Sequence, residues 1–258
     1  MKRRVAQRVS LVILLFCMLS MCCTAVGEGP LAGKIIFLAG DSRSSDDYTF
    51  YGDLLAAKTG ANVLVMGQSG ATAAQFASDA YLERVTANPH DYCIVLIGGN
   101  DTGEAGTVGT FDHASVNGQS GEPLVEEPDL DADYNGTAFI QCLYHFICRW
   151  QRDVAPSGAV LLLCTDLPQQ RYDSESVWSD PENLQRKNNA IRECAMLCGV
   201  TLVDLCAACD FDMSMEPYFV PPTDKENDRG VYFMDGLHPN RRGFDVITDV
   251  LVNELVDE

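Results

Sequence analysis

The feature that most constrains the fold is a set of five short, mainly apolar runs, separated from one another by stretches with helical spacing. Unbroken apolar runs of this length are typical of strands that are buried on both faces. Strands of this kind that alternate with helices predict a parallel sheet, covered on both faces through right-handed crossovers. The runs are residues 35–39, 62–66, 92–97 and 160–164, together with the short predicted strand 201–204, which begins with Thr201 and ends with Asp204.

Helical spacing or composition occurs in five segments, and the 258 residues of the chain are enough for one domain of ordinary size. No internal repeat or linker indicates a second domain. Residues 206–232, which contain three prolines, are expected to be irregular. The predicted helices are residues 48–59, 72–84, 137–154, 182–198 and 241–256.

The first apolar run ends at Gly40, Asp41 and Ser42. Ligands of open α/β sheets bind beyond the carboxyl ends of the strands, so Ser42 is a candidate nucleophile. The alternative is that these three residues form only a turn followed by a helix cap.

Near the other end of the chain, Asp235 and His238 are three residues apart. A serine hydroxyl becomes a good nucleophile when an imidazole accepts its proton and a carboxylate orients that imidazole. Ser42, His238 and Asp235 could supply these three roles. Read alone, the His238-Pro239 pair could equally be a turn before the final helix.

Two further strand ends carry groups that could face the same space. Gly67–Gly70 follows the second run, and its glycines would let backbone amides approach a ligand closely. Asn100 follows the third run and could donate an amide hydrogen to a developing oxyanion. Each segment, taken alone, could also be an ordinary turn.

Together these four blocks resemble the SGNH hydrolases, also called GDSL esterases and lipases. The order of the blocks is that of the family, and the resemblance spans roughly residues 34–255. The matching blocks are Gly40-Asp41-Ser42, Gly67-Gln68-Ser69-Gly70, Gly98-Gly99-Asn100-Asp101 and Asp235-Gly236-Leu237-His238-Pro239.

The resemblance implies a three-layer, flavodoxin-like α/β/α sandwich with Ser42 as nucleophile, His238 as base and Asp235 as its partner. It also implies an oxyanion hole made by the Ser42 amide, the Gly70 amide and the Asn100 side chain. Two positions depart from the family pattern, because Arg43 stands where Leu is frequent and Ala71 where Asp is common. We expect these departures to alter the shape of the pocket.

Residues 1–25 are interpreted as an export signal, because four basic residues precede an apolar run over residues 11–19. That run is shorter than the roughly 20 residues that span a bilayer. The domain would then occupy residues 26–258. Residues 19–22 also resemble a lipobox, which would instead attach a lipid anchor at Cys22 and leave the protein outside the cytoplasm but membrane-bound.

The net charge disfavours nucleic acid and anionic membranes as partners. The formal charge is -19, and removal of the four basic residues within residues 1–25 gives -19 - 4 = -23. We therefore expect a small-molecule or carbohydrate ester as partner. The oligomeric state does not follow from the sequence.

Eight cysteines follow the export signal, and we expect core packing or disulfides for them, with Cys93 and Cys164 as buried thiols. The group Cys194, Cys198, Cys206 and Cys209 has a spacing that zinc could use, which is the less favoured alternative.

Residues 131–136 match the first half of a calcium loop, but Cys142 replaces the glutamate expected at its twelfth position. No cofactor or resident metal is predicted.

The sequence thus predicts an exported serine esterase. Short acyl esters, such as acetyl esters on carbohydrate, are favoured as substrates because the domain is small and the polar loop 102–134 would border the site. A lysophospholipase or lipase is the first alternative. A glycan-binding protein that has lost catalysis is the second.

Overall fold

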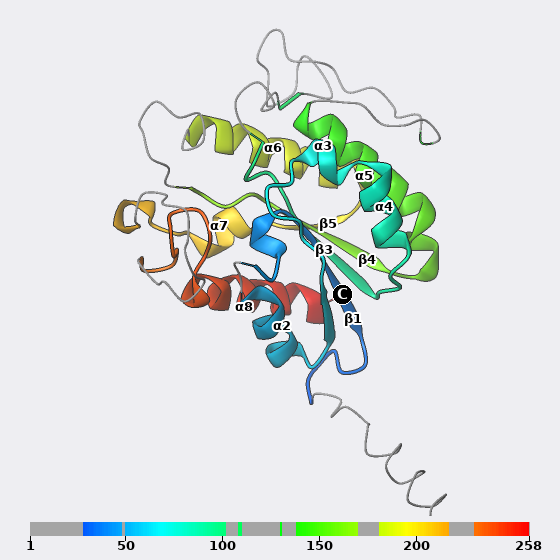
Figure 1. Ribbon diagram of the computed structural model, residues 1–258, viewed down its shortest axis with the longest axis horizontal. Helices are drawn as coiled ribbons and strands as arrows, with labels where there is room; N and C mark the ends of the chain where they lie inside the picture. The colour runs from blue at the N-terminus through cyan, green and yellow to red at the C-terminus, as the bar shows by residue number, and fades with distance from the viewer. Residues whose placement is uncertain are drawn as a thin grey trace, which may run out of the picture.

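The structure is a computed structural model that describes residues 28–47, 50–101, 108–109, 130, 138–169, 181–216 and 230–257. Five strands form one all-parallel sheet in the order β2-β1-β3-β4-β5 (Figure 1). Each strand coincides with one of the five apolar runs, so that prediction is confirmed. The strands are β1 (Ile35–Gly40), β2 (Asn62–Val65), β3 (Tyr92–Leu96), β4 (Val160–Cys164) and β5 (Thr201–Val203).

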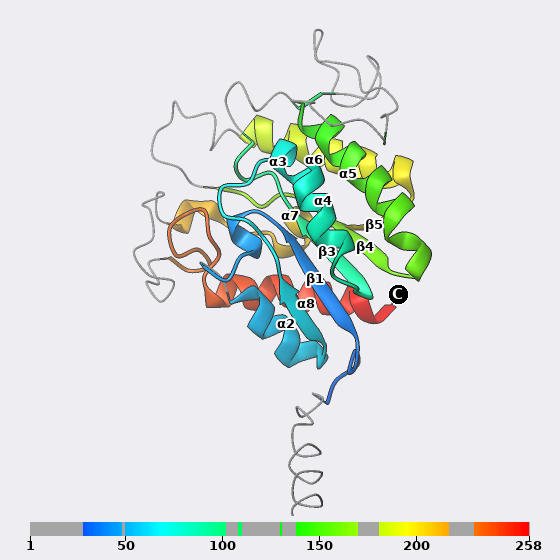
Figure 2. The same cartoon turned by 45° about the vertical axis from the view of Figure 1, so that its right-hand side comes forward.

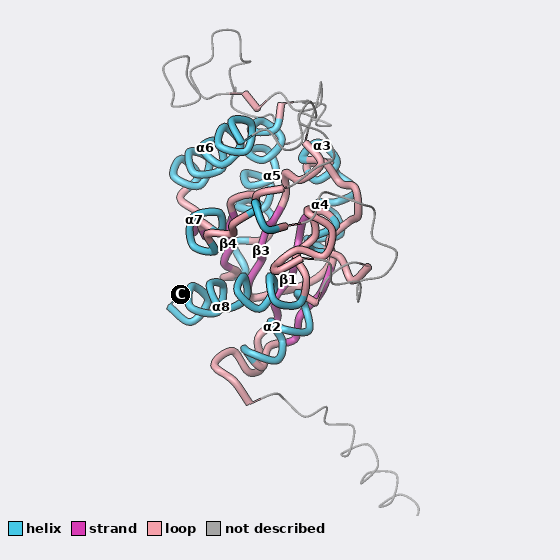
Figure 3. Tube along the Cα trace, turned by 90° about the vertical axis from the view of Figure 1, so that its left-hand side faces the viewer, coloured by secondary structure: helices cyan, strands magenta, loops and turns pink. Residues whose placement is uncertain are grey.

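Helices cover both faces of the sheet and make the three layers that were expected (Figures 1 and 3). One face carries α2 (Tyr51–Thr59) and α8 (Arg241–Asp257), with the short α7 (Leu205–Cys209) beside α8. The opposite face is covered by α3 (Ala73–Phe76), α4 (Asp79–Thr86), α5 (Phe139–Asp153) and α6 (Pro181–Cys198).

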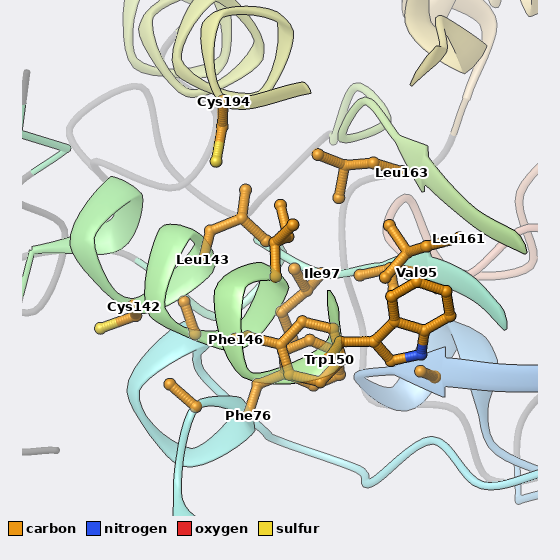
Figure 4. Close-up of a cluster of buried hydrophobic side chains, with 14 of the residues drawn as sticks. Phe76, Val95, Ile97, Cys142, Leu143, Phe146, Trp150, Leu161, Leu163 and Cys194 are labelled. Carbon is orange, nitrogen blue, oxygen red and sulfur yellow. The ribbon is translucent and has the colours of Figure 1, made fainter. Parts of the chain in front are cut away.

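Successive side chains of each strand point to opposite faces, so each strand feeds two hydrophobic clusters. In β1, Phe37 belongs to the cluster under α5 and α6, whereas Ile36 and Leu38 belong to the cluster under α2 and α8. Figure 4 shows the first cluster, where Phe76 and Phe146 lie with their ring centroids 4.1 Å apart. Burial on both faces explains why the runs contain no polar alternation.

The strand order places the topological switch point of the sheet at the end of β1. The chain passes from β1 to β2 on one side and then crosses to β3 on the other, so the direction of winding reverses beside β1. Gly40 at the end of β1 is paired with Leu96 at the end of β3. The residues that follow these two strands are therefore neighbours, at the position where open α/β sheets bind ligands.

Two helical predictions were wrong in detail. The segment predicted as one helix over residues 72–84 forms α3 and α4, because the Ser78 side chain caps the start of α4 by accepting from the Tyr81 amide. The segment predicted as irregular contains α7, whose start is capped by the Asp204 side chain. Both caps are side-chain contacts that compete with the continuation of the preceding element.

The eight cysteines beyond the proposed export signal are all free thiols. Cys93, Cys142, Cys164 and Cys194 are buried, which supports core packing rather than disulfides. Burial raises the pKa of the Cys93 and Cys164 thiols, as expected for buried neutral groups.

Within the described ranges, no cluster of three or more His, Cys, Asp or Glu side chains is arranged to hold a metal ion. None of the helices placed by the structure combines the length and apolar character needed to cross a bilayer. The proposed export signal and the half calcium loop at 131–136 lie outside the described residues.

Candidate active site

Ser42 lies in a tight turn directly after β1. Asp41 precedes a short 3₁₀ turn, Ser42–Ser44, and its carboxylate accepts a hydrogen bond from the Arg43 amide at 3.0 Å. Gly40 has φ +146, and a Cβ there would lie 1.9 Å from the Leu96 carbonyl oxygen. Only glycine fits this close approach, so the strand can turn sharply and present Ser42 at the edge of the sheet.

Asp235 and His238 lie in the loop before α8, which reaches the end of β1 (Figure 2). Asp235 Oδ1 accepts hydrogen bonds from the Leu237 amide at 2.9 Å and the His238 amide at 2.7 Å. Its other oxygen, Oδ2, lies 2.7 Å from His238 Nδ1. One carboxylate thus fixes both the backbone turn and the orientation of the imidazole.

The imidazole connects this loop to the first strand. His238 Nε2 lies 2.9 Å from Ser42 Oγ, although the two residues are 196 positions apart in sequence. Ser42 is 7% exposed and His238 is 4% exposed, so the contact is nearly enclosed by protein. The structure therefore brings together the hydroxyl, imidazole and carboxylate that the sequence nominated.

The two other motif segments lie around the same strand end. The Gln68 amide donates to the Gly40 carbonyl at 2.9 Å, which attaches the segment that carries Gly70 to β1. Asn100 Nδ2 donates one hydrogen bond to the Ala71 carbonyl at 3.0 Å, so the end of β3 is attached to the residue after Gly70. Gly70 has φ +77, a left-handed conformation that favours glycine.

Asp101 reinforces this attachment. Both of its carboxylate oxygens accept from the Ala73 amide, at 3.0 and 3.1 Å, and the side chain is 2% exposed. Burial raises the pKa of Asp101 to about 7. Asp101 had no predicted role beyond its place in the third motif block.

Arg43 is buried and does not face the solvent beside Ser42. The side chain is 0% exposed and turns into the protein, where Nε and Nη2 donate to Asp41 at 3.0 and 2.7 Å. Ala71, the other departure from the family pattern, is also buried at 1% exposure. Both positions pack inside the fold because the turns that carry them fold back over the sheet.

Two charged residues near the site were missed in the sequence. Asp166 pairs with Arg43 Nη1 and accepts from Lys187 Nζ at 2.7 Å, and both residues are buried. Asp166 comes two residues after the fourth apolar run, a position that could have marked it as a strand-end residue. Lys187 lies inside α6, and nothing in its local sequence distinguishes it from a surface lysine.

The charges in this group stabilise each other. Burial alone would raise the pKa of Asp166, but Arg43 and Lys187 outweigh burial and hold that pKa below its usual value. Burial likewise opposes the charged form of Arg43, yet Asp166 and Asp41 raise its pKa. Arg43 and Asp166 are therefore ionised across the physiological pH range.

A hydroxyl, an imidazole and a carboxylate in hydrogen-bonded sequence, at the carboxyl edge of a parallel sheet, define the class of serine hydrolases. Within that class, the sequence model of the GDSL-like lipase/acylhydrolase family matches residues 35–246. The chain belongs to this family and is an ester-hydrolysing enzyme. No curated protein sequence matches it.

Solved structures with similar folds include a protein from Lactobacillus plantarum, which is 23% identical with a TM-score of 0.59. That similarity covers 87% of this chain and 97% of the other. A protein described as a possible lipase, from Chitinophaga pinensis, is 17% identical with a TM-score of 0.57, covering 87% and 98% of the two chains. A GDSL-like lipase from Bacteroides thetaiotaomicron is 15% identical with a TM-score of 0.52, covering 87% and 88%. These similarities concern the fold.

Proposed function

We propose that the protein is a serine esterase in which Ser42 is the nucleophile, His238 the general base and Asp235 the residue that orients it. The observation that carries this proposal is the 2.9 Å separation of His238 Nε2 and Ser42 Oγ, with Asp235 Oδ2 2.7 Å from the other ring nitrogen. Both distances are within the range in which a base can accept a proton.

In the proposed reaction, Ser42 Oγ attacks the ester carbonyl while His238 Nε2 accepts its proton. The amides of Ser42 and Gly70 and the side chain of Asn100 then stabilise the tetrahedral oxyanion. An Asn side-chain amide carries two hydrogens, and the Ala71 carbonyl accepts one of them, so the second is the one assigned to the oxyanion. His238 returns the proton to the departing alcohol, and water repeats the cycle on the acyl-enzyme.

For the substrate we propose short acyl esters, such as acetyl groups on carbohydrate. Polar side chains that follow Ser42 within five residues support this proposal. Ser45 Oγ lies 3.2 Å from Ser69 Oγ, and Ser69 Oγ donates to Asp47 Oδ2 at 3.2 Å. The exposed Ser69 hydroxyl and Asp47 carboxylate can accept further hydrogen bonds from a sugar, whereas an alkyl chain would take them out of water without adding any.

A lipase-type activity on lysophospholipids is the second candidate, supported by the family's description as lipases and acylhydrolases. We further propose that the enzyme works outside the cytoplasm, after export directed by residues 1–25. A lipid anchor at Cys22 is the alternative to release.

The test compares wild type, Ser42→Ala and Ser157→Ala on p-nitrophenyl acetate, butyrate and longer esters. Ser157 is the matched control, because its hydroxyl donates to the Val154 carbonyl at the opposite end of the sheet. We expect Ser42→Ala to lower kcat by about 10⁴-fold or more, and Ser157→Ala to leave it unchanged. Equal rates in wild type and Ser42→Ala would overturn the proposed nucleophile.

Acetylated xylan and a lysophospholipid then separate the two substrate classes. Faster release of acetate supports the carbohydrate proposal. Faster release of fatty acid would replace it with the lipid alternative.

A further inference from the structure

Four charged side chains form a continuous buried chain behind the catalytic turn. They alternate in sign, from Asp41 through Arg43 and Asp166 to Lys187, and none is more than 4% exposed. Arg43 donates to Asp41 and pairs with Asp166, and Lys187 donates to Asp166 at 2.7 Å. The chain joins the ends of β1 and β4 to α6, and its two negative and two positive charges balance.

This ion chain also holds the backbone at the end of β3. Lys187 Nζ donates to the Gly98 carbonyl at 2.6 Å. Asp41 Oδ2 accepts from the Gly99 amide at 3.2 Å. The peptide group between Gly98 and Gly99 is therefore held at both of its polar atoms, its carbonyl by Lys187 and its amide by Asp41, which are the two ends of the ion chain.

The glycines at this position leave room for the ion chain. A Cβ on Gly98 would lie 3.2 Å from Asp166 Oδ2, and a Cβ on Gly99 would lie 2.8 Å from Arg43 Nη2. The charged groups occupy the space that side chains on Gly98 and Gly99 would need. The backbone before Asn100 therefore packs directly on the ions, without an intervening side chain.

Buried ion pairs contribute little to stability compared with well-packed apolar residues, since desolvation offsets their attraction. Their directed hydrogen bonds, however, fix geometry. Donors that stabilise an oxyanion are effective when they are held in place before the reaction, so a rigid support for Asn100 affects the transition state more than substrate binding.

We propose that Lys187 is a positioning residue for the reaction: through the Gly98 carbonyl, and together with Asp166 and Arg43, it holds Asn100 in the orientation that stabilises the oxyanion. This inference rests on the proposed function, because it takes Asn100 as an oxyanion donor. Lys187 is 4% exposed and donates to a backbone carbonyl, so it acts through Asn100 and not on the substrate.

The first experiment compares Lys187→Met with Arg192→Met on the ester that wild type hydrolyses fastest. Arg192 lies on the same helix and pairs with Asp204 at 2.8 Å, but its side chain is 35% exposed and it contacts a strand end that carries no motif. We expect Lys187→Met to lower kcat by about 10- to 100-fold with KM unchanged, less than the roughly 10²- to 10³-fold loss when an oxyanion donor is removed. Arg192→Met should leave both constants unchanged.

A double-mutant cycle separates positioning from a general structural role. If Lys187 acts through Asn100, Lys187→Met should lower kcat less than about threefold in an Asn100→Ala background. An equal loss of kcat in both backgrounds, or a loss that appears in KM, would overturn the proposal.

Because Lys187→Met leaves a net buried charge, Asp166→Asn/Lys187→Met provides a charge-balanced second variant that retains an oxygen facing Arg43. It should show the same loss of kcat and the same dependence on Asn100. A folded double variant with wild-type kcat would contradict the inference.

Amide hydrogen exchange provides a readout that does not depend on ester hydrolysis. Exchange over residues 97–101 should be faster in Lys187→Met than in wild type, and unchanged in Arg192→Met. If wild type hydrolyses no ester, the proposed function fails, and exchange alone decides whether Lys187 holds this segment. Unchanged exchange in Lys187→Met would overturn the positioning role in either case.

Discussion

Ion pairs occur at both ends of the sheet, but they are exposed at the amino end and buried at the carboxyl end. At the amino end, Lys34 and Asp91 form a 2.9 Å ion pair between the starts of β1 and β3, with side chains 49% and 35% exposed. At the carboxyl end, Arg43 pairs with Asp41 and Asp166, and all three side chains are at most 1% exposed. Water screens the first pair, whereas the second lies in a low-dielectric interior where loss of one partner leaves an uncompensated charge. The stability of the protein should therefore depend more on the buried Arg43 pairs than on the exposed Lys34–Asp91 pair.

Substitution of one histidine at each end of the sheet should give the largest difference, measured in kcat. His238→Gln should lower kcat by about 10⁴-fold or more, because no other described group is placed to accept the Ser42 proton. His90→Gln, at the amino end, should leave kcat unchanged, since the His90 ring contacts the Asn88 carbonyl. Steady-state kinetics on p-nitrophenyl acetate measures both.

The wild-type rate should also fall on the acidic side of its pH profile, because a protonated imidazole cannot act as a base. A flat profile, or equal effects of the two histidine substitutions, would remove the functional difference between the ends.

Arg43→Leu, which introduces the residue frequent in the family, should give the next largest effect. It leaves the carboxylates of Asp41 and Asp166 without their shared cation, and breaking such a buried pair destabilises by about 3–5 kcal/mol. Urea unfolding at neutral pH measures the change. A variant as stable as wild type would show that the carboxyl end tolerates unpaired buried charge.

Asp101 and Asp91 lie at opposite ends of the sheet, and their contributions to the free energy of unfolding should change with pH in opposite directions. Burial raises the pKa of Asp101 to about 7, so its contribution to the free energy of unfolding falls as pH rises from about 4 to 7. Burial would raise the pKa of Asp91, but the hydrogen bond from Lys34 outweighs it and lowers that pKa. The contribution of Asp91 is therefore lost only as pH falls below about 4.

The corresponding measurement is urea unfolding of wild type, Asp101→Asn and Asp91→Asn at pH 4 to 8. Relative to wild type, Asp101→Asn should gain stability with rising pH, by up to about 4 kcal/mol, since asparagine does not titrate and so lacks the loss that a pKa of about 7 brings. The difference for Asp91→Asn should stay constant over that range. Parallel profiles for all three proteins would contradict the assignment for Asp101.

Lys34→Met should have the smallest effect. The Lys34 ammonium is open to solvent, and exposed ion pairs contribute little. The urea midpoint of Lys34→Met should match that of wild type. Added salt should leave the difference between the two midpoints unchanged. A loss comparable to that of Arg43→Leu would remove the contrast between the two ends.

The sequence predicted the strands well, because strands buried on both faces need consecutive apolar residues, such as Ile36, Phe37 and Leu38. It also nominated Ser42 and His238, since strand ends and a local Asp-His spacing are short-range signals. The position of Arg43 could not be predicted, because its partner Asp166 is 123 positions away in sequence. The direction of a buried long side chain depends on such distant partners.

The breaks between helices were missed for a different reason. Residues 72–84 have an uninterrupted helix-forming composition, and only the Ser78 side chain marks the boundary. A serine within such a segment is also compatible with a continuous helix. The short α7 had a signal in Asp204, but five helical residues carry too little periodicity to be distinguished from a loop.

The separation of 196 positions between Ser42 and His238 has a consequence for biosynthesis. A ribosome makes Ser42 196 residues before His238. A nascent polypeptide that has not reached His238 therefore cannot form the contact between Ser42 Oγ and His238 Nε2. With the proposed roles of these two residues, ester cleavage would begin only once the loop before α8 has folded onto the sheet.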